Sequence, residues 1–333
     1  MAKKVFFGNY KGGVGKTTSV FNIARYLCED YNKRILLLDL DPQSSLSEIC
    51  MRYYKGSPMS GVKDIDNDDE SLNYVYDLSI RKIEKYESLE LNFDLDKLIK
   101  KKGNFHFIPS NLYYPADAEA AHKLGLDELA MKMQDSIEYM GILKGILDDI
   151  ENNYVIKDEA GQVILNAKFD YIFIDCPPAN NIITKGAFLV ADYFAIPTIL
   201  DGVSTNGVIH YIETVAGTYN QYCRDSEDAI LYRHLFGKRP KLLGIFYTFI
   251  RGQANYDEDK RNFGQSLDKA KNEAEDKGES DVAELLGKEY IMEKYINNYV
   301  DIARNISIGS TPNEKTDYEV FTEEFYNKLK EGD

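Results

Sequence analysis

A glycine-rich loop that ends in a lysine and two threonines stands near the start of the chain. The loop runs from Lys11 to Thr18 (KGGVGKTT) and follows the apolar run Val5–Gly8. Glycines let successive backbone N–H groups turn toward one anion, and a helix that begins here adds its positive N-terminal end. Lys16 is spaced to reach the β- and γ-phosphates of a nucleotide, and the Thr17 hydroxyl is spaced to ligate Mg²⁺. The pattern predicts a phosphate site made of these residues: Lys11, Gly12, Gly13, Val14, Gly15, Lys16, Thr17 and Thr18.

Two acids follow the next apolar run. Arg34–Leu40 reads as a buried strand, and Asp39 and Asp41 lie at its end, two positions apart. Residues spaced in this way on a strand point to the same side, so both carboxylates face the carboxyl edge of a parallel sheet. A turn acid is the alternative reading for either residue alone, because Asp is common where strands end in turns.

A third acid ends another strongly apolar run, Tyr171–Cys176. A strand that delivers one carboxylate beside a phosphate loop is the Walker B arrangement, in which Asp175 would hold a Mg²⁺-bound water. Cys176 follows directly, but no histidine lies near it in the sequence to activate the thiol. We therefore interpret Cys176 as a small buried residue and not as a nucleophile.

Taken together, the loop and the acid motifs resemble the deviant Walker A ATPases of the ParA/MinD family, and in particular the ParA/Soj-type partition ATPases. Tyr10 stands where an ordinary P-loop has its first glycine, and Lys11 is the additional lysine of the deviant form. In that family this lysine reaches across a dimer into the partner's nucleotide. The resemblance therefore implies an ATP-bound homodimer in which Lys11 offsets charge on the transferring phosphoryl group.

The same resemblance implies roles for the acids. Asp41 would orient the attacking water, and Asp39 would lie near the Mg²⁺ shell. The implied catalytic residues are Lys11, Lys16 and Asp41. The implied metal site consists of Thr17, Asp39 and Asp175, with ATP and Mg²⁺ as cofactors. The hypothesis is an ATP hydrolase.

The remaining periodicities predict the frame that positions these residues. Leu242–Phe249 is a further buried strand, and Phe105–Pro109 and Phe194–Ile199 are candidates. Helical patterns lie between the strands, at Thr17–Tyr31, Ala116–Ile150, Thr205–Arg224 and Tyr318–Lys330. Alternation of strands and helices favours an α/β fold, a doubly wound, mostly parallel sheet with helices on both faces. Such a P-loop NTPase fold would place the loop and the acids at one edge.

Three stretches interrupt this alternation and read as insertions into a single domain that spans residues 1–333. Tyr53–Lys102 is polar and contains an acidic run. Asn152–Lys168 has a turn between short β-like pieces, which predicts a hairpin. Gln253–Lys288 alternates in charge sign and reads as an exposed helical excursion.

Composition limits the function classes. The net charge is −15, so binding to nucleic acid would need a local basic patch. Four separated cysteines without a C-x-x-C pair argue against a zinc or iron–sulfur site. With no bilayer-length apolar stretch and no apolar leader, we expect a cytoplasmic protein that does not bind membranes, or a nucleoid-associated one if it binds DNA.

The family resemblance implies DNA and an adaptor protein as partners, and the residues of this chain give only limited support for DNA binding. ParA-like proteins usually bind DNA non-specifically and work with an adaptor, a ParB-like centromere-binding protein. The candidate DNA contacts form two clusters, namely Arg233, Lys238, Arg239 and Lys241, and Arg251, Lys260 and Arg261. A solvated loop cluster is the plainer reading. Tyr318–Lys330 is amphipathic but acidic, which predicts docking onto the protein's own core.

Three functions remain open. The leading hypothesis is DNA or plasmid partition, reset by hydrolysis with the adaptor. The first alternative is a positioning or regulatory ATPase that carries protein cargo without DNA. The second is an interaction module whose nucleotide is hardly turned over, and Asp41 and Lys11 argue against it.

Overall fold

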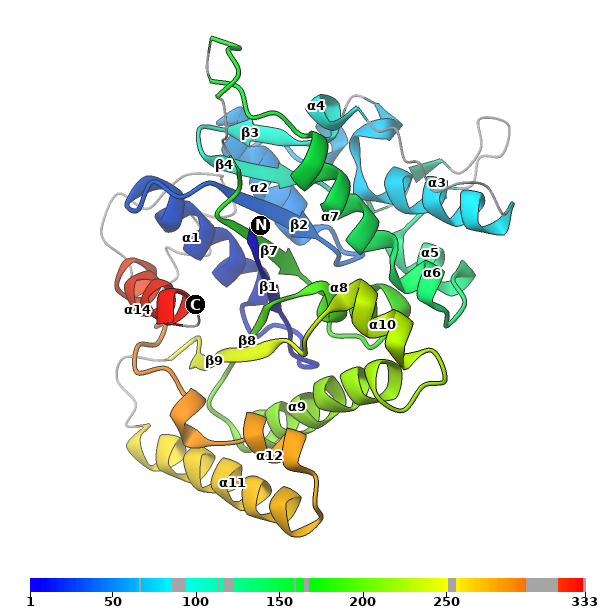
Figure 1. Ribbon diagram of the computed structural model, residues 1–333. Helices are drawn as coiled ribbons and strands as arrows, with labels where there is room; N and C mark the ends of the chain where they lie inside the picture. Colours follow the sequence, from blue (N-terminus) through cyan, green and yellow to red (C-terminus); the bar gives the residue numbers. More distant parts are fainter. Residues whose placement is uncertain are drawn as a thin grey trace.

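A seven-stranded sheet forms the centre of the protein (Figure 1). The computed structural model describes residues 1–65, 67–85, 94–112, 114–115, 123–158, 160–164, 168–250, 256–297 and 317–331. Within these residues the strand order is β3-β4-β2-β7-β1-β8-β9. The strands are β1 (Lys3–Phe7), β2 (Ile35–Asp39), β3 (Lys100–Lys102), β4 (Phe105–Ile108), β7 (Tyr171–Asp175), β8 (Tyr193–Thr198) and β9 (Lys241–Tyr247).

All neighbouring strands of this sheet are parallel except β3, which runs antiparallel to β4. β2 and β7 are buried along their whole length, as expected of central strands covered on both faces. The six strands expected from apolar runs are all present, with ends that differ by at most two residues. The mostly parallel α/β fold is therefore confirmed.

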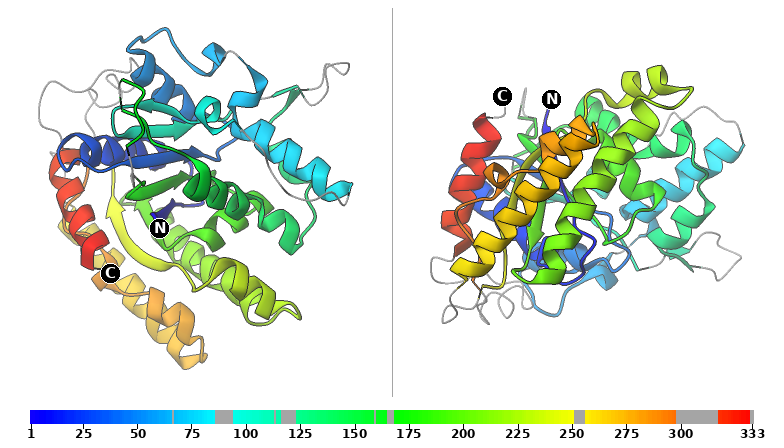
Figure 2. Two further views of the ribbon diagram at one scale, coloured as in Figure 1. Left: turned by 45° about the horizontal axis from the view of Figure 1, so that its top comes forward. Right: turned by 90° about the horizontal axis from the view of Figure 1, so that it is seen from below.

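One face of the sheet is covered by α1 (Lys16–Glu29), α2 (Ser45–Lys55) and α14 (Asp317–Glu331). Alternate strand residues face these helices, and Phe7, for example, packs against both Phe173 and Phe325. Figure 2 shows α1 and α14 lying together on this side. The amphipathic C-terminal helix thus docks onto the core as predicted, because its apolar residues Phe321, Phe325 and Leu329 are fully buried against the sheet and α1.

The other face is covered by a larger set of helices. These are α3 (Leu72–Glu84), α5 (Leu126–Lys132), α6 (Ile137–Met140), α7 (Ile142–Asn153), α8 (Ile182–Val190) and α9 (Gly202–Cys223). In Figure 1, α11 (Asp257–Asp276) and α12 (Ser280–Leu285) lie below α9 at the bottom, and α10 (Ala229–Phe236) lies above α9 at the right. The short elements of the described residues are α4 (Leu95–Leu98), the 3₁₀ turns at Val62–Asp64, Asp68–Glu70 and Lys288–Tyr290, and the two-residue pair β5 (Tyr114–Pro115) and β6 (Lys123–Leu124).

The single helix predicted over Ala116–Ile150 is wrong. Its described part is divided into β6, α5, α6 and α7, and residues 116–122 lie outside the described residues. Met133 and Ser136 have extended backbone angles, which stop one helix and start the next. The apolar spacing continues through this break because both helices pack on the same core.

The three predicted insertions are more closely attached to the core than their polar sequences indicate. β3 extends the main sheet, and α3 buries Tyr76. Near residues 152–168, Lys157 and Val163 form an antiparallel bridge across a turn. α11 and α12 are helical, but they pack on α9 and bury Phe263, so this segment is not simply an exposed excursion.

None of the helices within the described ranges combines the length and the apolar character needed to cross a bilayer.

Candidate functional site: a phosphate loop and buried carboxylates at the carboxyl edge of the sheet

The glycine loop connects the central strand β1 to α1. Gly13 and Gly15 have φ angles of 73° and 74°, in the left-handed region that favours glycine. Gly15 is also the N-cap of α1, which begins at Lys16. The loop therefore has the backbone turn and the helix N-terminus that an anion site requires.

Lys16 is held inside this loop by backbone oxygens. Its side chain is buried, and Nζ donates to the carbonyls of Asn9 at 3.2 Å and Lys11 at 3.3 Å. Burial lowers the Lys16 pKa, while the charges of Asp175 and Asp41 oppose this shift. In the described part of the chain Lys16 makes no ion pair within 4 Å, so its charge is available for a bound phosphate.

Thr17 and Asp175 meet directly. The Thr17 hydroxyl donates to Asp175 Oδ2 at 2.7 Å, whereas Asp175 Oδ1 is buried and has no hydrogen-bond partner among the described residues. Burial and the nearby charge of Asp39 raise the pKa of Asp175 well above its ordinary value. An unpartnered buried carboxylate oxygen beside a hydroxyl is a site that a hard cation would stabilise.

Asp39 lies next to Asp175, because the two residues are register partners on the adjacent parallel strands β2 and β7. Asp39 Oδ2 accepts hydrogen bonds from the Ser47 backbone N and the Ser47 hydroxyl, both at 2.7 Å. Burial raises the pKa of Asp39 to about 6, and the Ser47 hydrogen bonds oppose that shift. The sheet register thus places two buried carboxylates side by side, as the sequence predicts.

Asp41 lies just beyond this pair and is only partly buried. Its Oδ1 accepts the backbone N–H of Gln43 at 2.9 Å, and its backbone N–H donates to Asp39 Oδ1 at 3.2 Å. The side chain is therefore fixed by a local turn at the edge of the site, where a water could reach it.

These residues fit a Mg²⁺ ion that is completed by phosphate and water. No group of three or more His, Cys, Asp or Glu side chains that could hold a metal by itself occurs among the described residues. Mg²⁺ beside a nucleotide normally takes only one or two protein ligands. Thr17 and the free oxygen of Asp175 meet that need, and Asp39 is engaged by Ser47.

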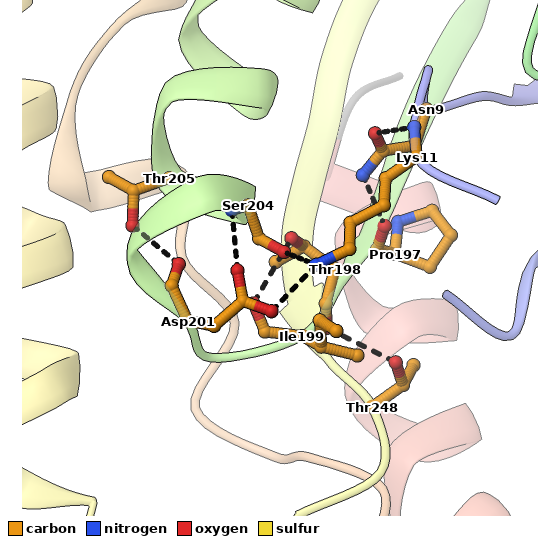
Figure 3. Close-up of polar contacts among 9 residues, drawn as sticks. All are labelled: Asn9, Lys11, Pro197, Thr198, Ile199, Asp201, Ser204, Thr205 and Thr248. Atoms are coloured by element: carbon orange, nitrogen blue, oxygen red, sulfur yellow. Dashed lines mark hydrogen bonds and ion pairs between the residues drawn. The ribbon is translucent and has the colours of Figure 1, made fainter. Parts of the chain in front are cut away.

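Lys11 is turned toward a helix of its own protomer. Its Nζ donates to Asp201 Oδ2 at 2.6 Å and to Ser204 Oγ at 2.9 Å, at the start of α9 (Figure 3). We did not predict these two partners from the sequence. Asp201 is the N-cap of α9, and its Oδ1 accepts the N–H of Ser204 at 2.6 Å, but the sequence pattern predicted this helix only from Thr205 and so did not identify the cap.

Two further polar residues join the loop to neighbouring strands. Asn9 Nδ2 donates to the Pro197 carbonyl at 2.9 Å, and Thr248 Oγ1 donates to the carbonyls of Val14 and Thr198. Both residues follow apolar strands, which is the signal that could have identified them. They fix the ends of β8 and β9 against the loop (Figure 3).

Arg239, one of the predicted DNA contacts, is engaged within the protein, whereas Lys238 is exposed. We use the name basic cavity for a space of about 590 Å³ near these residues. Its lining includes five cations and two acids: Arg224, Arg233, Lys238, Arg239, Lys241, Asp281 and Glu284. Arg239 pairs with Asp281 at 3.2 Å and Glu284 at 2.5 Å. Arg224 also pairs with Asp281. The cavity is therefore a mixed-charge cavity and not a simple basic patch.

The second predicted cluster does not extend the basic cavity. Arg251 lies outside the described residues. Lys260 lies over the Tyr295 ring, and Arg261 is near Glu258, in the first turn of α11. A helix of this length spans about 30 Å, and α12, with which Arg239 pairs, follows its other end. The two clusters thus lie near opposite ends of α11.

Comparison with known proteins identifies similar chains. A family model described as an AAA domain matches residues 2–225. An uncharacterised protein of Pseudomonas putida is 29% identical over 216 residues, which cover 65% of this chain and 63% of that protein. The sporulation initiation inhibitor protein Soj of Bacillus subtilis is 28% identical over 65% of each chain. The chromosome partitioning protein ParA of Myxococcus xanthus is 27% identical over 63% of this chain and 57% of its own. The chain thus spans less than two thirds of the length of these relatives.

Solved structures show the same fold. The ATP complex of a Cyanothece McdA variant has a TM-score of 0.62 at 18% identity, over 99% of this chain and 96% of that one. A putative plasmid partition protein of Borrelia burgdorferi bound to AMPPNP has a TM-score of 0.56 at 17% identity, over 99% of each chain.

Proposed function

The chain belongs to the AAA domain family, and from this membership and the geometry of the loop we propose a partition-type ATPase that binds ATP with Mg²⁺. The observation that carries the proposal is the convergence of Lys16, Thr17 and Asp175 at one edge of the sheet, with Asp175 Oδ1 buried and unpartnered. The resemblance to ParA/Soj-type proteins supports the partition class.

Each residue has a distinct part in the proposed hydrolysis. The loop N–H groups and Lys16 bind the β- and γ-phosphates, and Lys16 reaches them from a buried position in which its charge has no carboxylate partner in the part of the chain that the structure describes. Thr17 and Asp175 would hold the Mg²⁺, which supplies charge neutralisation on the phosphates. Asp41, at the open side of the carboxylate pair, orients the attacking water.

ATP-dependent dimerisation is the part of the proposal that depends on Lys11. Two protomers would face each other with both nucleotides between them, and each Lys11 would contact the partner's nucleotide. With ATP and Mg²⁺, light scattering at matched protein concentrations should show a shift from monomer to dimer. Lys11→Ala should lower both the dimer fraction and the rate of phosphate release. An equal dimer fraction in variant and parent would remove the role of Lys11 in the partner's site.

Lys144→Ala is the matched control for that experiment. Lys144 is a partly exposed lysine on α7 that pairs with Asp148 one helical turn away. It lies outside the phosphate loop, so this substitution should leave dimerisation and hydrolysis unchanged. Phosphate release by the parent also separates an ATPase from an interaction module that only holds its nucleotide.

A positioning or regulatory ATPase that carries protein cargo is the second candidate, and the basic cavity favours it. Arg239, one of the predicted DNA contacts, pairs with Asp281 and Glu284 of α12, and the neighbouring Arg224 also pairs with Asp281. Co-sedimentation with random duplex DNA, with and without ATP, distinguishes the two candidates. In either case we propose an adaptor protein, ParB-like in the partition case, that resets the dimer by stimulating hydrolysis.

A further inference from the structure

The backbone and the side chain of Lys11 are both tied to the connection between β8 and α9. The Lys11 N–H donates to Asn9 Oδ1 at 2.9 Å, and Asn9 in turn donates to the Pro197 carbonyl. At the other end of the side chain, Nζ lies 2.6 Å from Asp201 Oδ2 and 2.9 Å from Ser204 Oγ (Figure 3). Hydrogen bonds thus hold Lys11 both at its backbone N–H and at its side-chain amine.

Asp201 is well placed to hold an amine because its carboxylate is itself fixed. Oδ1 caps α9 by accepting the Ser204 N–H, which turns Oδ2 toward Lys11. Ser204 is buried, so its hydroxyl cannot exchange freely with water. Partial burial would raise the pKa of Asp201, but hydrogen bonds from Lys11 and Ser204 outweigh it and hold the pKa below its ordinary value. The carboxylate is charged at neutral pH.

The neighbouring ring contacts show that α9 is packed against this part of the loop. Tyr10 lies edge-on to Tyr211 of α9, with ring centroids 5.0 Å apart. Tyr211 is buried, so the helix and the residue before Lys11 share one packed contact. A cap residue on this helix therefore has a defined position relative to Lys11.

We propose that Asp201 and Ser204 are positioning residues for Lys11, which hold its amine on its own protomer until a nucleotide phosphate of a second copy of this chain replaces them. The inference rests on the proposed ATP-bound dimer and deepens it. The proposal requires the Lys11 amine, which lies 2.6 Å from Asp201 Oδ2, to leave that carboxylate when it reaches into a partner's nucleotide. Each Lys11 that reaches across the dimer interface must first break its ion pair with Asp201. Without ATP no nucleotide phosphate replaces this carboxylate, so the ion pair disfavours dimers that form without ATP.

The expected size of the effect follows from exposure. The Lys11 side chain is 30% exposed and that of Asp201 is 41% exposed, so solvent weakens the pair. Pairs of this kind shift an equilibrium by roughly two- to five-fold. A dimer breaks two such pairs at separate sites, so the dimerisation constant should change by about four- to 25-fold.

Asp201→Asn tests the pair without removing the helix cap, because Asn and Asp are equally good at the N-cap position. Dimerisation would be measured across a protein concentration series with Mg²⁺ and a non-hydrolysable ATP analogue. The variant should dimerise about four- to 25-fold more tightly than the parent, and in a Lys11→Ala background the same substitution should have no effect. An unchanged or weaker dimer, or an equal change in the Lys11→Ala background, would overturn the proposal.

Glu213→Gln is the matched control for charge. Glu213 is a partly exposed carboxylate on the same helix and is paired only with His210 in the described structure. Its removal changes the net charge as Asp201→Asn does, but it should leave the dimerisation constant unchanged.

The reactivity of the Lys11 amine is a second measurement, and it does not need a dimer. In the nucleotide-free protein, the rate at which acetic anhydride modifies Lys11 can be followed by peptide mass spectrometry. Asp201→Asn should raise that rate roughly two- to five-fold, Ser204→Ala should raise it less, and Glu213→Gln should not raise it. If labelling responds while neither protein dimerises, the dimer proposal fails and the positioning role stands. If dimers form and labelling does not respond, the positioning role fails.

Discussion

The phosphate loop and the basic cavity lie near opposite ends of β9, and both contain cations that the sequence presents as ligand contacts. Thr248, just past the end of β9, touches the loop, and Lys241, at its start, lines the basic cavity, about 20 Å away. Among the described residues, the Lys16 amine donates to two backbone carbonyls and makes no ion pair, and a buried oxygen of Asp175 lacks a hydrogen-bond partner. In the basic cavity, Arg239 has two carboxylate partners.

The two regions differ in whether their charged and polar atoms already have partners within the protein, and this difference shows how a cluster of charges can be interpreted. A binding site leaves polar atoms unsatisfied toward the space where the ligand lies, and it accepts a cost in stability for doing so. A structural cluster satisfies its charges internally. By this criterion the loop is organised for a ligand, whereas two cations of the basic cavity, Arg224 and Arg239, hold α12 to the core.

The largest expected effect is on the loop. Lys16→Ala should weaken ATP binding by about 2–5 kcal/mol, because it removes the buried cation that faces the phosphates. Isothermal titration calorimetry with ATP and Mg²⁺ measures this change, and Lys144→Ala is the control. Binding within a few-fold of the parent would contradict our interpretation of Lys16 as a phosphate ligand.

Asp41→Ala should separate binding from turnover. The ground-state contacts of the loop remain, so the dissociation constant for ATP should change little. The attacking water loses its orienting carboxylate, and the rate of hydrolysis should fall by about 10²- to 10³-fold. Single-turnover phosphate release measures the rate, with Asp148→Ala on α7 as the control. Turnover at the parental rate would show that another residue positions the water.

The loop could be predicted from sequence because its residues are contiguous and each acid ends an apolar strand. Asp39 and Asp175 lie far apart in the chain, yet the rule that parallel strands share a carboxyl edge is enough to bring them together. β3 could not be predicted, because three consecutive lysines at a sheet edge have no apolar alternation. The pair between Lys11 and Asp201 joins residues 190 apart, and only the packing of α9 against the loop brings them into contact.

The same limit explains the basic cluster. Arg239 meets Asp281 and Glu284 across a long stretch of intervening chain. Charge along the sequence shows which side chains are cationic, but it does not show which of them a distant helix will neutralise. Of the four clustered residues, Lys238 is exposed and makes no ion pair in the described part of the chain.

A smaller effect is expected for substitutions in the basic cavity, which should change the stability of the fold. Arg239→Ala should lower the free energy of unfolding by about 1–3 kcal/mol, because it leaves the carboxylates of α12 without a mostly buried partner. Thermal and denaturant unfolding measure the loss. Arg261→Ala is the control, since that side chain is 66% exposed and its change should lie within about 0.5 kcal/mol. ATP affinity should stay at the parental value in both variants. If Arg239→Ala unfolded as the parent does, the ion pairs of the cavity would not be structural.

The smallest expected effect concerns DNA, and it decides between the two candidate functions. The net charge of −15 repels a polyanion, so attraction must come from charges within a Debye length, about 8 Å at physiological salt. Lys238→Glu changes that local field without breaking an ion pair of the described structure. Lys144→Glu makes the same change in net charge on α7, so the difference between the two variants isolates the basic cavity.

For a partition ATPase, fluorescence anisotropy on random duplexes should show ATP-dependent binding that falls steeply with salt. Lys238→Glu should then weaken it a few-fold more than Lys144→Glu and reduce the salt slope by about one. Equal effects of the two variants would place the DNA contacts elsewhere. The absence of any ATP-dependent signal at low salt would instead favour a protein cargo.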